Sequence, residues 1–529
     1  DRYSECDETK PILTDFVHAE ILPLGHVRRS ELVKKWHLLG VAEPDLAAVE
    51  HKIVESERQI SSLMRTSLLP PYPVFVLMML SQLDAGRRLN AQAGSHGYLY
   101  QALITQSLYG VSKNSHEIDQ LFSYLTQFAV LVSGRSEGAV GVGEAAEWHR
   151  SYCEQFFVDL DFTDILSRLC RALVLVARDG GIRFAYPYLY YYFYARHLSD
   201  TIDEEPTRQT VRELTRTLHL ESSADIFLFL SYLSKNTFVI RTILETASGL
   251  FEGGEEVDFK EQTRFLNGLT RQTPELVLDL QLDTDRNRKR ELEARDERDD
   301  RLETDDRDYE FDETVGQFQV MNAAHRTIQI VGQILRNYSG SLPGDRKIAL
   351  CRACASLSYR VIGFVLELVN QHGEALIGDM VHIIADLHPE AGRERITREA
   401  NGFLFDLCRR AAFGAMKHLS AAVGQEELDR VFREVFDGNS EFRDQVALMT
   451  IRMDHYKAFP KTEVLSVYRE TGENPYTAGL VRHLVWYHLY VRRTPFRVRA
   501  EVCAKLGIKQ NTLFIENRAK SVSMKHSGE

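Results

Sequence analysis

Cys351 and Cys354 are separated by two residues, a spacing that can hold zinc or support thiol–disulfide chemistry. A structural zinc site also needs further ligands, and no second Cys-x-x-Cys pair or close histidine completes the set. Small thiols three residues apart on a helix also pack well in a core. We therefore expect both cysteines to be structural, with a redox or metal role as the alternative.

Gly340, Gly344 and Lys347 superficially resemble a loop that binds phosphate. Such a loop reads Gly-x-x-x-x-Gly-Lys-Ser/Thr, whereas here two residues separate Gly344 from the lysine and Ile348 follows it. A turn between two helices is the simpler prediction. The sequence contains no complete phosphate loop and no His-Glu-x-x-His motif, and its 18 histidines do not cluster at ligand spacing. We predict no catalytic residue and no metal site.

The composition is that of a chain with several domains. Its 529 residues are 44% hydrophobic and 26% charged, which provides enough apolar material for several cores. Seven cysteines, an odd number scattered along the chain, argue against a disulfide framework and for a reducing compartment. We expect a cytoplasmic protein.

The start of the chain has no targeting signal. Its first residue is Asp1, and no basic-then-apolar segment follows, so we predict no signal peptide and expect a piece of a longer protein. The most apolar run, Val74 to Leu80, is far shorter than the roughly 20 residues that cross a membrane. It predicts a buried helix, and we expect no membrane partner.

Residues 283–313 carry most of the net charge. They contain 15 acidic and 8 basic side chains, a balance of −7 out of −12, which leaves −5 for the rest of the chain. Their large apolar side chains are few (Leu292, Leu302, Tyr309 and Phe311), so the stretch cannot build a core. It predicts either a solvated linker or a single exposed helix. This overall charge gives no general reason to bind nucleic acid.

Helical spacing of apolar residues dominates the remaining sequence. The clearest segments are 26–39, 74–83, 98–108, 117–130, 160–177, 224–234 and 316–336. Val174 to Ala177 and Ile182 to Phe184 flank the turn-forming run Arg178-Asp-Gly-Gly181 and predict one small hairpin. Helices followed by such a hairpin are typical of a winged helix. Residues 316–529 show no strict repeat and suit a loose α-superhelix.

Seven aromatic residues lie between Tyr186 and Tyr194. Pro187 suits the first position of a helix, where a missing N–H costs little. Aromatic side chains bring large apolar areas with polar tips. The simplest interpretation is therefore a buried aromatic helix.

The same segment resembles the signature that closes the winged-helix domain of NACHT and related STAND NTPases, a Phe-x-His-x-x-Phe-Gln-Glu-Tyr-Phe-like run. Phe184 matches the first Phe, Leu189 the next apolar position, and Tyr192 with Phe193 the final aromatic pair. Tyr186 falls where the family has a histidine that contacts the phosphates of ADP. The resemblance implies that Tyr186 contacts the nucleotide, with a hydroxyl in place of a switchable imidazole.

Two further segments are similar to the same family and occur in the family's order. Ile21-Leu-Pro-Leu24, followed by a helix that reaches Trp36, resembles the segment after the ATPase core. Pro71-Tyr-Pro73 and the apolar run after it resemble a helix start whose proline lies against the adenine. The resemblance implies Pro73 as a second nucleotide contact. The simpler alternatives are a helix-starting proline at Pro73 and a core anchor at Trp36.

The resemblance implies a mainly α protein with a small helical domain, a winged-helix domain and an α-superhelical region. We expect residues 1–17 to be the end of an ATPase core or a linker, 18–115 the small helical domain, 116–205 the winged helix, 206–280 a helical region, 281–315 a charged linker and 316–529 a superhelical sensor.

In the family, these domains close over ATP or ADP, which is bound mainly by an upstream P-loop domain. A trigger, possibly a foreign protein, opens the resting state, and self-oligomerisation then activates an effector domain, in bacteria commonly for defence against phage. We expect this chain to be the regulatory and sensor part and to be inactive as an ATPase alone. The alternative is a helical-repeat protein–protein interaction scaffold without nucleotide dependence.

The end of the chain is locally basic, with nine lysines and arginines between residues 491 and 525 against Glu501 and Glu516. Val502 to Leu513 resembles a helix-turn-helix with Gly507 at the turn, a motif that can place a helix in a DNA groove. A solvated last pair of helices is the simpler alternative, and we expect no nucleic-acid partner.

Overall fold

The computed structural model describes residues 22–40, 46–63, 71–89, 96–112, 115–135, 138–178, 180–251, 254–269, 276–279, 283–304, 313–437 and 441–511. These residues are mainly helical, which confirms the predicted fold class at that level. The chain forms two compact units, Asp1–Thr242 and Ile243–Glu529, and each is described by itself. Helix α12 (Thr237–Gly249) contains the division between them.

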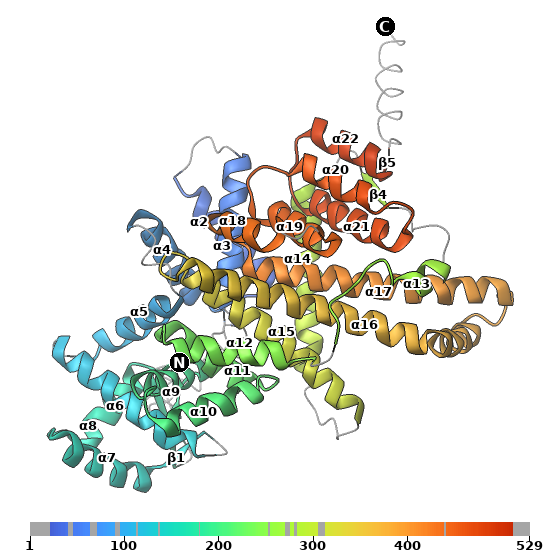
Figure 1. Cartoon of the computed structure of the whole chain (residues 1–529). Helices are drawn as coiled ribbons and strands as arrows, with labels where there is room; N and C mark the ends of the chain where they lie inside the picture. Colours follow the sequence, from blue (N-terminus) through green and yellow to red (C-terminus); the bar gives the residue numbers. More distant parts are fainter. Residues whose placement is uncertain are drawn as a thin grey trace. The chain divides into compact units, whose positions relative to one another are not determined.

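The described residues of the first unit form helices and one small sheet (Figure 1). In chain order its elements are α2 (His26–Leu38), α3 (Leu46–Leu63), α4 (Pro73–Leu89), α5 (His96–Tyr109), α6 (Ser115–Ser133), β1 (Val140–Gly141), α7 (Val142–Phe156), α8 (Phe162–Arg171), β2 (Leu175–Arg178), β3 (Gly181–Phe184), α9 (Pro187–Asp200), α10 (Glu205–Arg216) and α11 (Glu221–Leu233).

The sheet of the first unit is antiparallel, with strand order β1-β3-β2. The predicted hairpin is confirmed, because Leu175 pairs with Phe184 and Arg178 with Gly181. Gly180 in its turn has φ 75°, a value that favours glycine. Strand β1, which pairs Val140 with Ile182, was not predicted because two residues carry no alternating pattern.

The helix predicted over 160–177 is wrong in its last part. Asp161 caps the start of α8, since its side chain accepts a hydrogen bond from the backbone N–H of Asp164 at 2.7 Å. The helix ends at Arg171, Leu173 adopts φ 55°, and strand β2 begins at Leu175. Pairing with β3 therefore prevails over the helical spacing of the apolar residues.

Helix α9 lies between α6 and α11 in the core of the first unit. Tyr192 and Phe193 are fully buried. The ring of Phe193 lies 5.5 Å from Phe122 of α6, and the ring of Tyr192 lies 6.0 Å from Phe229 of α11. The interpretation of this segment as a buried aromatic helix is confirmed.

The described residues of the second unit are helical apart from two short strands. Its elements are α13 (Arg264–Leu269), β4 (Val277–Asp279), α14 (Thr284–Thr304), α15 (Glu313–Asn337), α16 (Gly344–Leu387), α17 (Arg393–Val423), the 3-10 turn η2 (Glu426–Leu428), α18 (Asp429–Phe432), the π-helical turn η3 (Arg433–Asp437), α19 (Phe442–His455), α20 (Lys461–Glu470), α21 (Pro475–Val491), α22 (Phe496–Leu506) and β5 (Lys509–Asn511).

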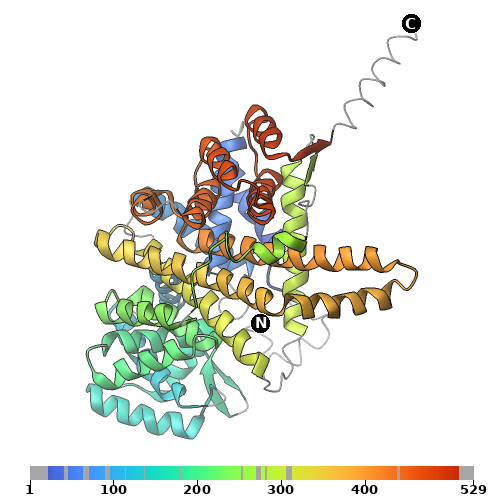
Figure 2. The same cartoon turned by 45° about the vertical axis from the view of Figure 1, so that its right-hand side comes forward.

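Three long helices form the centre of the second unit. Helices α16 and α17 run antiparallel beside each other (Figure 2), and α15 packs against both. Gly332 of α15 touches α17 so closely that a Cβ atom there would lie 2.5 Å from the carbonyl oxygen of Ala422. Helices α19 and α21 also pack against α17.

The charged stretch is a helix over Thr284–Thr304, one of the two forms that its composition allowed. This helix is not solitary, because α14 packs against α21. Asn287 Nδ2 donates to the carbonyl oxygen of Tyr490 at 3.1 Å, and Arg493 forms an ion pair with Asp285 at 3.3 Å. Residues 305–312 of the predicted linker lie outside the described residues.

The helix-turn-helix suggested for Val502 to Leu513 is wrong. Helix α22 ends at Leu506, and Gly507 terminates it with φ 67°. The chain then enters β5, where Gln510 pairs in parallel with Leu278 of β4. A strand therefore occupies the place of the second helix, as far as the described residues reach, because long-range pairing is not visible in local spacing.

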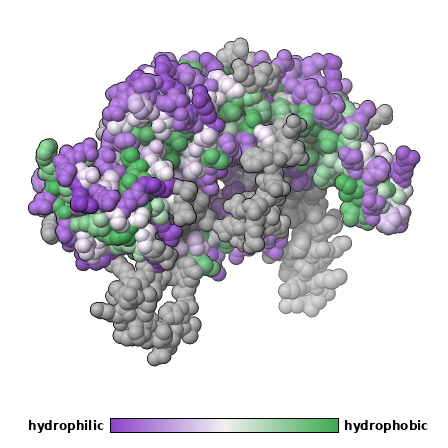
Figure 3. All heavy atoms as spheres, turned by 90° about the horizontal axis from the view of Figure 1, so that it is seen from below, coloured by the Kyte–Doolittle hydropathy of each residue, from purple (hydrophilic) through white to green (hydrophobic). Residues whose placement is uncertain are grey.

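Helix α16 is long and apolar enough to cross a membrane by length and composition. Half of its most apolar 18-residue window is buried inside the protein. Core helices of soluble proteins can be equally long and apolar. We therefore treat α16 as a core helix. On the face drawn in Figure 3, hydrophobic residues lie among hydrophilic ones.

Candidate functional site

Pro73 is the first residue of α4, as predicted from its position before an apolar run. The segment before α2 meets this helix start, since the backbone N–H of Leu24 donates to the carbonyl oxygen of Pro71 at 2.9 Å. Trp36 Nε1 donates to Asp84 at 2.6 Å and so anchors α2 on α4. The interpretation of Pro73 as a helix-starting proline is thus confirmed, whereas Trp36 is only half-buried and holds α2 through a hydrogen bond and not as a core residue. Ile21 of the first motif lies outside the described residues.

Tyr186 directly precedes α9 and has extended backbone angles, φ −136° and ψ 144°. Pro187 then provides the first residue of the helix. The side chain of Tyr186 makes no capping hydrogen bond to α9, so its hydroxyl is not used to satisfy the helix start.

The starts of α4 and α9 meet through aromatic rings. The ring of Phe75 contacts the ring of Tyr186 edge-on at 6.0 Å, and Tyr72 lies 6.3 Å from Phe75. Tyr186 also stacks on Tyr188 at 5.9 Å. The structure therefore brings the segment that contains Pro73 and the segment that contains Tyr186 to one place in the first unit.

The first turns of α4 and α9 contain no acidic residue. The first N–H groups of a helix lack intrahelical partners and carry partial positive charge, so a helix start favours an anion. Phosphate groups often bind at such positions. Two helix starts without first-turn carboxylates, joined by an aromatic contact, are chemically suited to an anionic ligand with a flat apolar part.

The hydroxyl of Tyr186 stays protonated at neutral pH. Burial, and then the neighbouring Tyr72, raise the pKa of Tyr186 above its usual value. The group can donate or accept a hydrogen bond, but it cannot change charge near pH 7 as a histidine can.

Three aromatic neighbours of Tyr186 were not predicted as site residues. Tyr72 and Phe75 lie next to Pro73 in the sequence, so the proline motif was a signal that could have indicated them. Tyr188 is buried behind Tyr186 and lies 6.0 Å from Tyr100 of α5. Nothing in the sequence near Tyr100 indicates that contact, which depends on how α5 packs.

His149 of α7 is a buried histidine with a structural role. Its Nδ1 is 3.1 Å from the hydroxyl of Tyr124, and its Nε2 is 3.0 Å from the carbonyl oxygen of Leu160. Both ring nitrogens are therefore engaged in joining α6, α7 and the segment before α8.

Cys351 and Cys354 are both buried in α16. Burial raises the pKa of Cys351 to about 12 and that of Cys354 well above its usual value, so neither thiol is reactive at neutral pH. Among the described residues, no three His, Cys, Asp or Glu side chains are grouped to hold a metal. Residues 338–343 form the predicted turn between α15 and α16, not a phosphate loop.

Gly134-Arg-Ser-Glu-Gly138 fits the Gly-x-Ser-x-Gly pattern of hydrolase nucleophiles. That motif works on a sharp turn from a strand into a helix, whereas this segment follows α6 and precedes β1. The order of elements is reversed, so we assign no nucleophile here. Ser136 itself lies outside the described residues.

Comparison with known proteins gives a match to a family model. Residues 142–194 match the family model of Novel STAND NTPase 4. The matched segment runs from the first residue of α7 into α9, so it includes Tyr186 but not Pro73. Curated proteins and solved structures give no match. The family match supports membership of this chain in the STAND NTPases.

Proposed function

We propose that this chain is the regulatory and sensor part of a signal-transducing STAND NTPase of the NACHT-like kind. The observation that carries the proposal is the meeting of the α4 and α9 starts at Phe75 and Tyr186, within a unit that contains the family match. In this proposal, the first unit holds the nucleotide-bound resting state.

We propose further that residues 116–205 form a winged-helix domain. In chain order, α6, β1, α7 and α8 precede the hairpin of β2 and β3. The strand order β1-β3-β2 places the hairpin beside the short first strand. This order of elements supports the winged-helix assignment, and residues 18–115 would then be the small helical domain.

The nucleotide in this proposal is ATP or ADP. The adenine would lie against Pro73, and the phosphates would face Tyr186 and the helix starts. The absence of first-turn carboxylates in α4 and α9 supports this placement, because a carboxylate there would repel phosphate. Most of the phosphate contacts would come from a P-loop domain that precedes residue 1.

The second unit would carry the sensor. A trigger, such as a foreign protein, would bind the open state more tightly than the closed one and so shift the equilibrium between them. Opening would permit self-oligomerisation and activation of an effector domain. We propose that the signal acts in the cytoplasm and in defence against phage.

The coding sequence upstream of Asp1 provides the first test. It should encode a Gly-x-x-x-x-Gly-Lys-Ser/Thr loop within roughly 200 residues, followed by an apolar strand that ends in Asp. An upstream sequence without such a loop would refute the proposal and leave the helical interaction scaffold as the explanation.

The second test uses the protein extended to include that upstream domain. Tyr186→Phe should weaken ADP binding by about tenfold or more, because it removes one hydrogen bond to a charged group. Tyr191→Phe removes a hydroxyl from α9, the helix that Tyr186 precedes, and should leave ADP binding unchanged, so it serves as the matched control. Calorimetry on both variants measures the effect, and equal ADP affinities would contradict a contact at Tyr186.

A further inference from the structure

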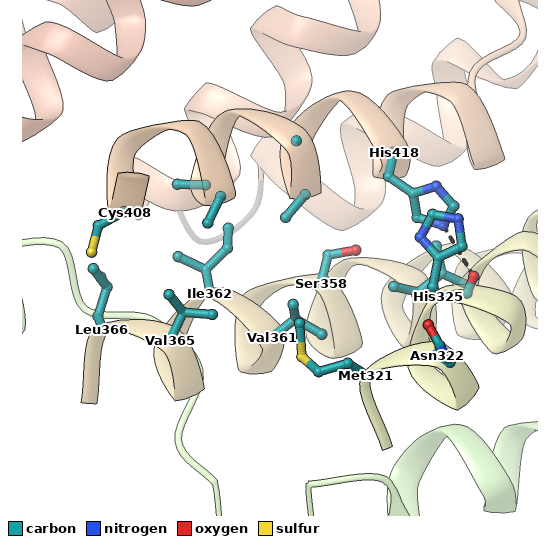
Figure 4. Close-up of a pocket in the computed structure, with 15 residues that line it drawn as sticks. Met321, Asn322, His325, Ser358, Val361, Ile362, Val365, Leu366, Cys408 and His418 are labelled. Atoms are coloured by element: carbon teal, nitrogen blue, oxygen red, sulfur yellow. Dashed lines mark hydrogen bonds between the residues drawn. The ribbon is translucent and has the colours of Figure 1, made fainter. Parts of the chain in front are cut away.

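A pocket of about 480 Å³ lies between α15, α16 and α17 in the second unit. Figure 4 shows its lining, with side chains from all three helices converging on one space. Ligand pockets in proteins typically measure about 300–1,000 Å³ and are mostly apolar. The volume is about three times the roughly 150 Å³ of a cavity that accepts benzene.

The walls of the pocket are apolar. Val361, Ile362 and Val365 of α16 line it together with small residues of α17, including Ala411 and Gly414. Small side chains on α17 leave the space that larger ones would fill. A Cβ atom added at Gly414 would meet no atom within 4 Å, so the space beside this residue is open.

One end of the pocket is polar. The imidazole rings of His325 and His418 stack at 3.6 Å, and His418 Nε2 is 3.0 Å from the carbonyl oxygen of His325. Asn322 lies beside them, whereas Cys408 and Leu366 line the opposite end (Figure 4). The pocket therefore has an apolar body and one end that can form hydrogen bonds.

The charge of the lining restricts the ligand. The residues that line the pocket include two histidines but neither lysine nor arginine. A phosphate group would be poorly neutralised there, whereas a singly charged carboxylate can accept from the side-chain amide of Asn322 and from one imidazole N–H; the Nε2–H of His418 already donates to a carbonyl oxygen.

We propose that this pocket binds a small monocarboxylate with an apolar tail, the carboxylate lying at the polar end formed by Asn322, His325 and His418. A ligand of about 12–20 non-hydrogen atoms would fit, scaled from the benzene-sized cavity. This site lies wholly within the second unit, and the inference does not depend on the nucleotide contact proposed above.

Decanoate is a suitable probe, titrated by calorimetry into the purified full chain. We expect one saturable site, and no saturable binding up to about 1 mM would overturn the proposal. Gly414→Leu should reduce the affinity by about tenfold or more, because the added side chain fills the pocket without displacing a neighbour.

Gly402→Leu is the matched control. Gly402 lies on the same helix, a Cβ atom there also meets nothing within 4 Å, and the residue does not line the pocket. This variant should bind decanoate as the unaltered protein does. If Gly414→Leu and Gly402→Leu have equal affinities, the pocket is not the site. Should Gly414→Leu fail to fold, as judged by its thermal unfolding, Ala411→Leu replaces it as the variant that fills the pocket. An unchanged affinity of Ala411→Leu for decanoate would then overturn the proposal.

The polar end is tested with Asn322→Leu, which keeps a side chain of similar size but removes its amide donor. We expect this change to weaken decanoate by about tenfold and to leave decan-1-ol almost unchanged. Equal losses for the two probes, or equal affinities of the unaltered protein for them, would overturn the assignment of a carboxylate to this end.

Discussion

Single residues show how burial and charge compete in the second unit. Lys417 Nζ lies 2.6 Å from both carboxylate oxygens of Asp454. Burial alone would raise the pKa of Asp454, but neighbouring charges, with Lys417 the largest, hold it well below its usual value. His488 lies among the same groups, and burial followed by the charge of Arg492 lowers its pKa to about 3. The cluster is therefore ionised at Asp454 and neutral at His488.

His488 should make the second unit sensitive to acid. Its pKa is about 3 in the folded protein but about 6.5 in the unfolded chain, so below pH 6.5 only the unfolded chain gains the proton. The free energy of unfolding should therefore fall by up to about 1.4 kcal/mol per pH unit from this residue between pH 6.5 and 4. His488→Phe should remove that part of the slope. Urea unfolding at pH 7, 6 and 5 measures it, and identical slopes in both proteins would contradict the assignment.

The candidate site could be predicted only in part from its residues. Pro73 and Tyr186 were identified through resemblance, and they lie in segments that meet. The ring that makes the contact belongs to Phe75, which the motif did not single out. Tyr100 could not be identified, because its place behind Tyr188 is set by tertiary packing and not by local spacing.

At the scale of elements, close approach between helices depends on glycine. Gly332 lets α15 contact the backbone of α17 at Ala422, a distance that no side chain permits. Gly316 lies on the same helix but is exposed, with nothing within 4 Å of an added Cβ atom. A side chain therefore cannot be added at Gly332 without moving α17, whereas one can be added at Gly316.

Gly332→Ala should destabilise the second unit by about 1–3 kcal/mol, because the new methyl group must push α15 from α17. Gly316→Ala should be neutral or stabilise by up to about 1 kcal/mol, since alanine favours the helix. Denaturant unfolding of both variants gives the comparison. A loss of stability in Gly316→Ala equal to that in Gly332→Ala would show that contact with α17 is not the cause.

Elements with strong apolar periodicity were predicted well, and those made by pairing were not. The segments 26–39, 98–108 and 316–336 correspond to α2, α5 and α15. Strands β1, β4 and β5 are two or three residues long and exist through distant partners. Local spacing contains no information about such partners. The helix predicted over 160–177 and the helix-turn-helix predicted near the end of the chain were therefore partly wrong.

At the scale of the whole molecule, the compact units divide between Thr242 and Ile243, inside α12. The sequence analysis drew its clearest boundary at the charged residues 283–313, because composition is the only boundary signal that a sequence offers directly. The contacts that define compact units involve residues far apart in the chain. The finer domain boundaries given above stay predictions.

If an upstream domain provides most of the phosphate contacts, a prediction follows for the chain of residues 1–529 alone. It should hydrolyse no ATP and bind ADP more weakly than about 100 µM, because it contains no phosphate loop. A phosphate-release assay and calorimetry test both parts. ATP turnover that persists through purification to homogeneity would contradict the assignment of phosphate binding to an upstream domain.

The tyrosine-rich start of α9 also has an optical consequence. Burial raises the pKa of Tyr186 and of Tyr188 behind it, so near pH 10 both phenols are less ionised than an exposed tyrosine, which is about half ionised there. Phenolate absorbs ultraviolet light at longer wavelength than phenol. Any opening that brings Tyr186 into water at that pH would therefore increase the phenolate absorbance. Exposure of Tyr186 could then be followed by ultraviolet absorbance, without an attached dye.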